Sequence, residues 1–185
     1  MSRMFSQCKS LKKIDFSSFN TNNVTDMSQM FNECSSLEEL NLVNFNTNNV
    51  INMSQIFSGC SSLKKINLSN FNTSKVTDMR YMFYGCSSLK KINISNFNTS
   101  NVVKFNGMFF GCSSLKELNL SNFYTNNAKY MSYMFSGCFS LKKLIINNFN
   151  FDNVLDMYHM FYECSDILKK EIREKYNNIK EEAFE

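Results

Sequence analysis

The chain has 185 residues, of which 43% are hydrophobic, so its length allows one domain or at most two. Its net charge of +4 is too small to indicate a nucleic-acid-binding protein by itself. Because the chain has no apolar run of about 18 residues, the sequence predicts no membrane insertion within this segment.

One unit of 26 residues recurs through most of the chain, which makes a single domain the simpler interpretation. A constant period of about 20 to 50 residues is typical of stacked repeat arrays. The start, Met1–Cys8, aligns with Met27–Cys34, so the chain begins in the middle of a unit and we expect it to be a fragment of a longer protein. The marker of the period is a cysteine in every copy: Cys8, Cys34, Cys60, Cys86, Cys112, Cys138 and Cys164.

The first part of each unit predicts a short strand. In the unit Cys60–Gly85, apolar side chains at Leu63, Ile66 and Leu68 alternate with Lys65 and Asn67. This alternation points the apolar side chains inward and the polar ones outward, and it matches the L-x-x-L-x-L core of leucine-rich repeats. Stacked units would place these strands side by side in a parallel sheet.

The second part of each unit follows an Asn-rich turn and predicts a helical turn or short helix. Met79, Met82, Phe83 and Cys86 are spaced as on one face of a helix. Thr77 and Asp78 before them offer N-cap chemistry, and a glycine such as Gly85 tolerates a left-handed ending.

The predicted fold class is therefore a leucine-rich-repeat-like solenoid with a parallel sheet of short strands on one face and short helices or helical turns on the other. Residues 1–164 form the repeat part, a half coil plus six 26-residue coils. Residues 165–185 break the pattern, and their apolar side chains lie three or four positions apart among charges. This segment predicts an amphipathic C-terminal capping helix.

The unit C-S-S-L-K-K-I-N-L-S-N-F-N-T resembles the BspA-like leucine-rich repeat family, in the 26-residue variant of mycoplasma-type surface lipoproteins. The run F-N-T-x-x-V-T-D-M-x-x-M-F recurs at Phe19–Phe31 and Phe71–Phe83. The resemblance implies a right-handed solenoid at a cell surface or outside the cell, used for adhesion or host-protein binding. It brings no catalytic residue to this chain.

The cysteines are expected to be free thiols stacked as a structural ladder in the core, because each copy places its thiol at the same position before small residues and leucine. Disulfides between neighbouring units are the alternative, and their odd number would leave one cysteine unpaired. With no C-x-x-C and a single histidine, His159, we predict no metal, no cofactor and no enzyme. His159 occupies a variable column that we expect to be exposed.

Lysines dominate the outward positions of the predicted strands, with nine lysines against three glutamates. This face predicts binding of an acidic protein segment or a sulfated glycan. The alternative is a solvated face that discourages aggregation. Without interleaved aromatic side chains it does not indicate nucleic acid. The candidate residues are Lys64, Lys65, Lys90, Lys91, Lys116, Lys142 and Lys143.

Aromatic side chains in the later units replace Ser, Asn or Gln of the first units at outward positions: Tyr81, Tyr84, Phe110, Tyr130, Tyr133, Tyr158 and Tyr162. Tyrosine suits protein interfaces, although scattered exposed aromatics are also common. These positions predict a non-enzymatic protein-binding or adhesion module of a cell-surface protein. An intracellular scaffold or spacer is the alternative function.

Overall fold

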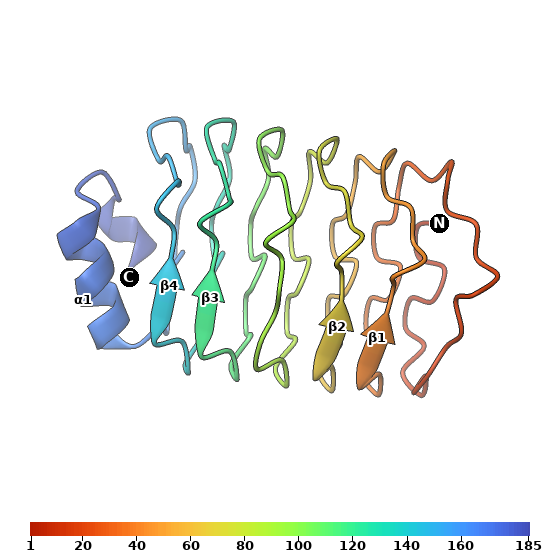
Figure 1. The fold of residues 1–185 in the computed structure, drawn as a ribbon. Helices are drawn as coiled ribbons and strands as arrows, with labels where there is room; N and C mark the ends of the chain where they lie inside the picture. Colours follow the sequence, from red (N-terminus) through yellow and green to blue (C-terminus); the bar gives the residue numbers. More distant parts are fainter.

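The computed structural model describes all residues from Met1 to Glu185. The repeated units lie side by side in a single row, with the N-terminus at one end and the helix α1 (Asp166–Lys175) at the other (Figure 1). Four short strands lie on one side of the row: β1 (Glu39–Asn41), β2 (Lys65–Asn67), β3 (Glu117–Asn119) and β4 (Lys143–Ile145). A 3-10 helix, η1 (Glu181–Ala183), follows α1.

The strands are parallel, as predicted, but they form two separate pairs. β1 pairs with β2, with Glu39 opposite Lys65, and β3 pairs with β4, with Glu117 opposite Lys143. Residues 90–93 occupy the equivalent place in the unit between β2 and β3, and no backbone hydrogen bond joins them to either neighbour. The expected continuous sheet is therefore interrupted in the middle of the row.

A second ladder of backbone hydrogen bonds connects the units more regularly than the strands do. The N–H groups of Met27, Gln29 and Phe31 donate to the carbonyls of Asn52, Ser54 and Ile56 in the next unit, at 2.9 to 3.0 Å. The pattern repeats in each following unit as far as Met131, Tyr133 and Phe135, and parallel bridges run from Asp26 and Asn52 through to Asp156. Backbone hydrogen bonds from every second residue of this segment thus connect each unit to the next.

This second ladder occupies the segment where the sequence predicts a helical turn or short helix, and the prediction of a helix is wrong. The segment consists of hydrogen-bonded turns, in which the Met30 N–H donates to the Met27 carbonyl and the Asn32 N–H donates to that of Gln29. Gln29 and Glu33 adopt φ values of 55° and 59°, in the left-handed region. A left-handed residue ends a right-handed helix, and the backbone groups that a helix would pair internally bond to the next unit instead.

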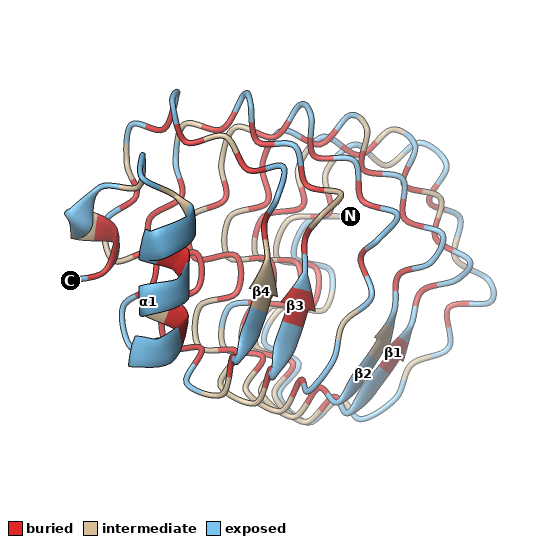
Figure 2. Ribbon diagram, turned by 60° about the vertical axis from the view of Figure 1, so that its left-hand side comes forward, coloured by how far each residue is buried: buried red, intermediate tan, exposed pale blue.

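Figure 2 shows that buried positions recur at the same places in successive units. The core is one continuous cluster of 52 buried hydrophobic residues. Its central column is a stack of phenylalanine rings whose neighbouring centroids lie 5.3 to 6.0 Å apart: Phe5, Phe31, Phe57, Phe83, Phe109, Phe135, Phe161 and Phe184. Because each unit contributes one ring, no unit could bury its core face without its neighbours.

The C-terminal segment completes the last unit by two different contacts. Ser165 is the N-cap of α1, with its hydroxyl accepting from the Leu168 N–H, and α1 buries Leu168 and Ile172 against the core. Beyond η1, Phe184 stacks on Phe161 and the carbonyl of Ala183 accepts from the Phe161 N–H. α1 is shorter than the predicted segment 165–185, and the remainder supplies the ring and the carbonyls that a further unit would otherwise provide.

Candidate functional site

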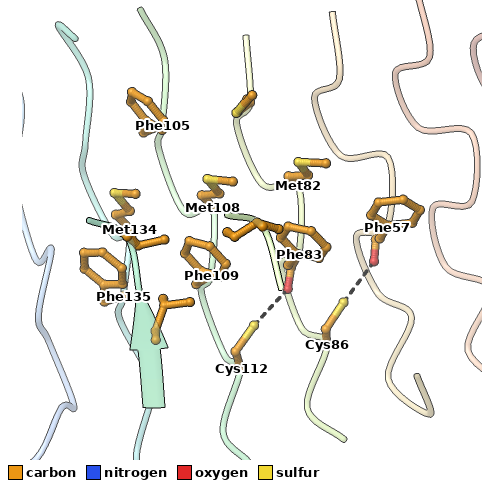
Figure 3. Packing of buried hydrophobic residues seen from close by; sticks show 14 of the residues in the cluster. Phe57, Met82, Phe83, Cys86, Phe105, Met108, Phe109, Cys112, Met134 and Phe135 are labelled. Carbon is orange, nitrogen blue, oxygen red and sulfur yellow. Dashed lines mark hydrogen bonds between the residues drawn. The ribbon is translucent and has the colours of Figure 1, made fainter. Parts of the chain in front are cut away.

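Six of the seven cysteines are buried, and all seven are free thiols. Each buried Sγ donates to the carbonyl oxygen of the phenylalanine 29 residues earlier, as for Cys86 to Phe57 and Cys112 to Phe83 (Figure 3). Burial raises the pKa of Cys34 to about 11 and that of Cys60 to about 12. A neutral thiol is a poor nucleophile, so this column is part of the core packing. Cys8, in the first half unit, is exposed.

The lysines of the strand face are exposed but differ in their partners. Lys64 and Lys65 form ion pairs with Glu38 and Glu39 at 2.7 and 2.8 Å. The pairing lowers the pKa of both carboxyl groups, chiefly through the hydrogen bond from each lysine. The other predicted lysines of this face form no ion pair: Lys90, Lys91, Lys116, Lys142 and Lys143.

A shallow groove of about 460 Å³ opens among three of these unpaired lysines, Lys90, Lys91 and Lys116, and the acidic residue Glu117 also lines it. It lies where the sheet is interrupted. Because Glu38 and Glu39 already compensate the charges of Lys64 and Lys65, these two lysines are weaker candidates for binding an anionic partner than the three lysines of this groove.

The predicted aromatic residues, except Tyr130, come together on the side of the second ladder. Tyr81 contacts Tyr84 edge-on with ring centroids 5.8 Å apart, and Tyr84 stacks on Phe110 at 4.8 Å. Phe110 then contacts Tyr133 at 6.2 Å, and Tyr133 contacts Tyr158 at 5.9 Å. The rings thus form one row across four units, in place of scattered exposed side chains.

His159 joins this row and is half-buried, whereas the variable column it occupies predicts an exposed side chain. Its imidazole lies 3.6 Å from the Tyr158 ring, 4.8 Å from that of Tyr162 and 5.4 Å from that of Tyr133, measured between centroids. Its Nδ1 is buried without a hydrogen-bond partner, so the ring is held by aromatic contacts. We call the whole row the aromatic ridge: Tyr81, Tyr84, Phe110, Tyr133, Tyr158, His159 and Tyr162.

The backbone that presents the ridge is left-handed at the same column of every unit. Tyr81, Tyr133 and His159 have φ values of 56°, 59° and 55°, which cost non-glycine residues about 1 to 2 kcal/mol each. Gly107 occupies this column in the fourth unit, and a Cβ there would lie 2.5 Å from the Tyr81 ring. The absence of a side chain at Gly107 therefore makes the space in which Tyr81 lies.

The same column is polar in the first units. The Arg3 guanidinium donates to the side chain of Gln29, and the Gln29 amide donates to that of Gln55 at 2.7 Å. This chain of hydrogen bonds stops before Tyr81, where the aromatic contacts begin. The surface therefore changes from amide to aromatic along the row, although the backbone beneath it is repeated.

The remaining surface offers little chemistry of other kinds. No group of three or more His, Cys, Asp or Glu side chains is placed to hold a metal ion. α1 is the one α-helix, and it is too short and too polar to cross a membrane.

The chain is similar to a family of Mycoplasma proteins and, more distantly, to a solved structure. A family model described as "Mycoplasma protein of unknown function, DUF285" matches residues 1–93 and 63–176. A leucine-rich repeat protein of T. pallidum, known from its crystal structure, is 20% identical with a TM-score of 0.41, over 78% of this chain and 72% of that one. No curated protein matches the chain.

Proposed function

The chain belongs to the DUF285 family of Mycoplasma proteins, and we propose that it is a non-enzymatic protein-binding module that holds its partner on the aromatic ridge. The observation that carries this proposal is the confinement of the ridge to the later units. Copied units need only their inward residues to stack, so the outward positions are free to differ. In this chain they differ by acquiring a continuous row of rings.

The chemistry of the ridge fits a protein surface. Tyr84, Tyr158 and Tyr162 each expose about two fifths of their surface, at 38%, 44% and 41%. Tyrosine offers a large apolar area and a polar tip while losing little conformational entropy, and it is enriched among the residues that dominate binding energies. Contacts between neighbouring rings hold the side chains before any partner arrives, which lowers the cost of association.

Replacing ridge residues by the chain's own early-unit residues should weaken binding without disturbing the fold. The variant is Tyr81→Gln, Tyr84→Ser, Phe110→Ser, Tyr133→Gln and Tyr162→Asn, copied from Gln55, Ser58 and Asn32. We expect peptides selected on the wild-type protein from a displayed random library to bind this variant at least about tenfold more weakly, a loss of about 1.4 kcal/mol. Fluorescence anisotropy with the selected peptides would measure it.

The matched control changes the strand face instead, with Lys90→Ser, Lys91→Ser and Lys116→Ser. This variant should bind the selected peptides as the wild type does. If the control loses binding while the ridge variant keeps it, the lysine groove is the binding surface and the ridge proposal is wrong. Equal binding by all three proteins would also overturn it.

We propose further that the repeat part is a BspA-like, leucine-rich-repeat solenoid displayed at the cell surface, on the strength of the sequence resemblance. The alternative is an intracellular scaffold or spacer. Trypsin added to intact cells that express the protein should degrade it while a cytosolic marker protein survives. Survival of the protein until the cells are lysed would favour the intracellular alternative.

A further inference from the structure

One position of the second ladder breaks the repeat in two units only. Asp26, Asn52, Asp78 and Asp156 occupy the same column, and each side chain accepts a hydrogen bond from the backbone N–H two residues on. The distances are 2.7 to 3.2 Å. Such Asx turns supply a side-chain acceptor for a backbone N–H that has no backbone acceptor. Lys104 and Tyr130 replace the acidic or amide side chain in the two units between Asp78 and Asp156.

The replacement leaves donors without acceptors. The backbone N–H of Asn106, two residues after Lys104, donates to no backbone or side-chain group, and the N–H of Ser132 after Tyr130 likewise donates to none. The other four units satisfy this same N–H through their Asx side chain. Asn106 is half-buried, so its unpaired N–H is available to an acceptor from outside the chain.

These residues surround a groove beside the start of the aromatic ridge. The groove measures about 320 Å³ and is lined by Arg80, Tyr81, Lys104, Asn106 and Tyr130. Its two cations differ, because the Arg80 guanidinium is held by the Asp78 carboxylate at 2.8 Å, whereas Lys104 has no acidic partner. With Arg80 and Asp78 cancelling each other, the groove carries one uncompensated positive charge.

We propose that this groove binds a carboxylate of the partner protein, from an aspartate or glutamate side chain, in place of the missing Asx group. The carboxylate accepts the Asn106 N–H and pairs with Lys104, while the neighbouring partner residues lie on Tyr81 and Tyr130. A single negative charge matches the single free cation, and charge-assisted hydrogen bonds are shorter and stronger than neutral ones. The inference rests on the proposed function, since it assigns the chemistry of one contact of the ridge partner.

The test follows the Asn106 amide directly, by ¹⁵N NMR of the full chain. The probe is the capped peptide Tyr-Glu-Tyr, with Tyr-Gln-Tyr as its uncharged counterpart and inorganic phosphate as a competing anion. We expect the Glu peptide to shift the Asn106 amide signal saturably, and the Gln peptide to bind at least about tenfold more weakly. An unmoved Asn106 signal, or tighter binding of phosphate than of the Glu peptide, would overturn the proposal.

The matched variants come from the chain's own column. Lys104→Asp restores the side chain of Asp26 and Asp78, so it should satisfy the Asn106 N–H internally, abolish the shift and raise Tm. Lys104→Arg keeps the charge and should retain binding. If Lys104→Asp binds the Glu peptide as the wild type does, the carboxylate site does not exist.

A further variant separates this inference from the function on which it rests. Phe110→Ser with Tyr133→Gln and Tyr162→Asn disrupts the ridge but leaves every residue of the groove in place. It should still respond to the Glu peptide at Asn106 even if the ridge proposal fails. Conversely, if the five-substitution ridge variant loses the selected peptides while Asn106 of the wild-type protein does not respond to the Glu peptide, the carboxylate site alone is refuted.

Discussion

Replacing Phe109 by alanine should lower the free energy of unfolding by about 3 to 5 kcal/mol, the range found when a large ring is removed from a close-packed core. The Phe109 side chain is fully buried, and its ring is stacked between those of Phe83 at 5.6 Å and Phe135 at 5.9 Å (Figure 3). Because the stability of a repeat array is roughly a sum over unit interfaces, the truncation weakens two interfaces in the middle of the row.

The adjacent residue provides the control, because it is also phenylalanine but faces outward. Phe110 is half-buried in the aromatic ridge, so Phe110→Ala should cost about 1 kcal/mol or less. Urea denaturation followed by far-UV circular dichroism would measure both variants. Equal losses for the two would show that the phenylalanine column does not dominate the stability of the row.

The inward residues of each unit could be predicted from the sequence because the period places them in the same columns. Leu63, Leu68 and Met79 are buried as the alternating and spaced patterns indicate. The helix was mispredicted because two consecutive turns of about four residues bury the same positions as one helical face. Left-handed backbone at residues such as Tyr81 has no clear signature in the sequence, because that column holds glycine only at Gly107, whereas glycine recurs in the other left-handed column.

The interruption of the sheet is only partly explained by charge. Lys64 and Lys65 occupy the same columns as Lys90 and Lys91 of the next unit, so lysine would face lysine if these two units paired. Between β1 and β2, which do pair, Glu39 faces Lys65 instead. Like charges opposite each other disfavour pairing. On the other side, Lys90 and Lys91 face Lys116 and Glu117, which is the same combination of charges that β4 and β3 present to each other. Because β3 and β4 do pair, charge does not explain why residues 90–93 fail to pair with β3.

The candidate site was visible in the sequence as residues that depart from the repeat, but their contacts were not. The aromatic substitutions could be recognised one by one, whereas the row through His159 depends on how the left-handed column aims the side chains. Lys104 is a departure that a comparison of columns could also have found, because three of its counterparts are aspartate. What required the structure is the unsatisfied Asn106 N–H beside it.

Raising the pH above about 9 should unfold the protein steeply, because its core contains a column of neutral thiols. Burial raises the pKa of Cys60 and Cys164 to about 12 from an ordinary value of 9.0, and raises those of Cys86, Cys112 and Cys138 well above it. The folded protein keeps these protons while the unfolded chain releases them, so the free energy of unfolding falls as pH rises.

This stabilisation is fully present below pH 9 and is lost as pH rises toward 12. Each of these five thiols should account for a loss of about 1 kcal/mol between pH 9 and pH 10, so that together they approach the whole stability of a typical domain. Urea denaturation at a series of pH values, with a phosphine reductant present to keep the thiols reduced, would measure the slope.

The variant Cys86→Ala with Cys112→Ala isolates the thiols from the other groups that titrate in alkali. Tyrosines and lysines are unchanged in it, so any difference in slope belongs to the two cysteines. The variant starts from a lower stability because it has lost packing. Its free energy of unfolding should nevertheless fall less steeply above pH 9, because its unfolding releases about two fewer protons. Parallel slopes for the two proteins would mean that the column of thiols does not set the alkaline limit of the fold.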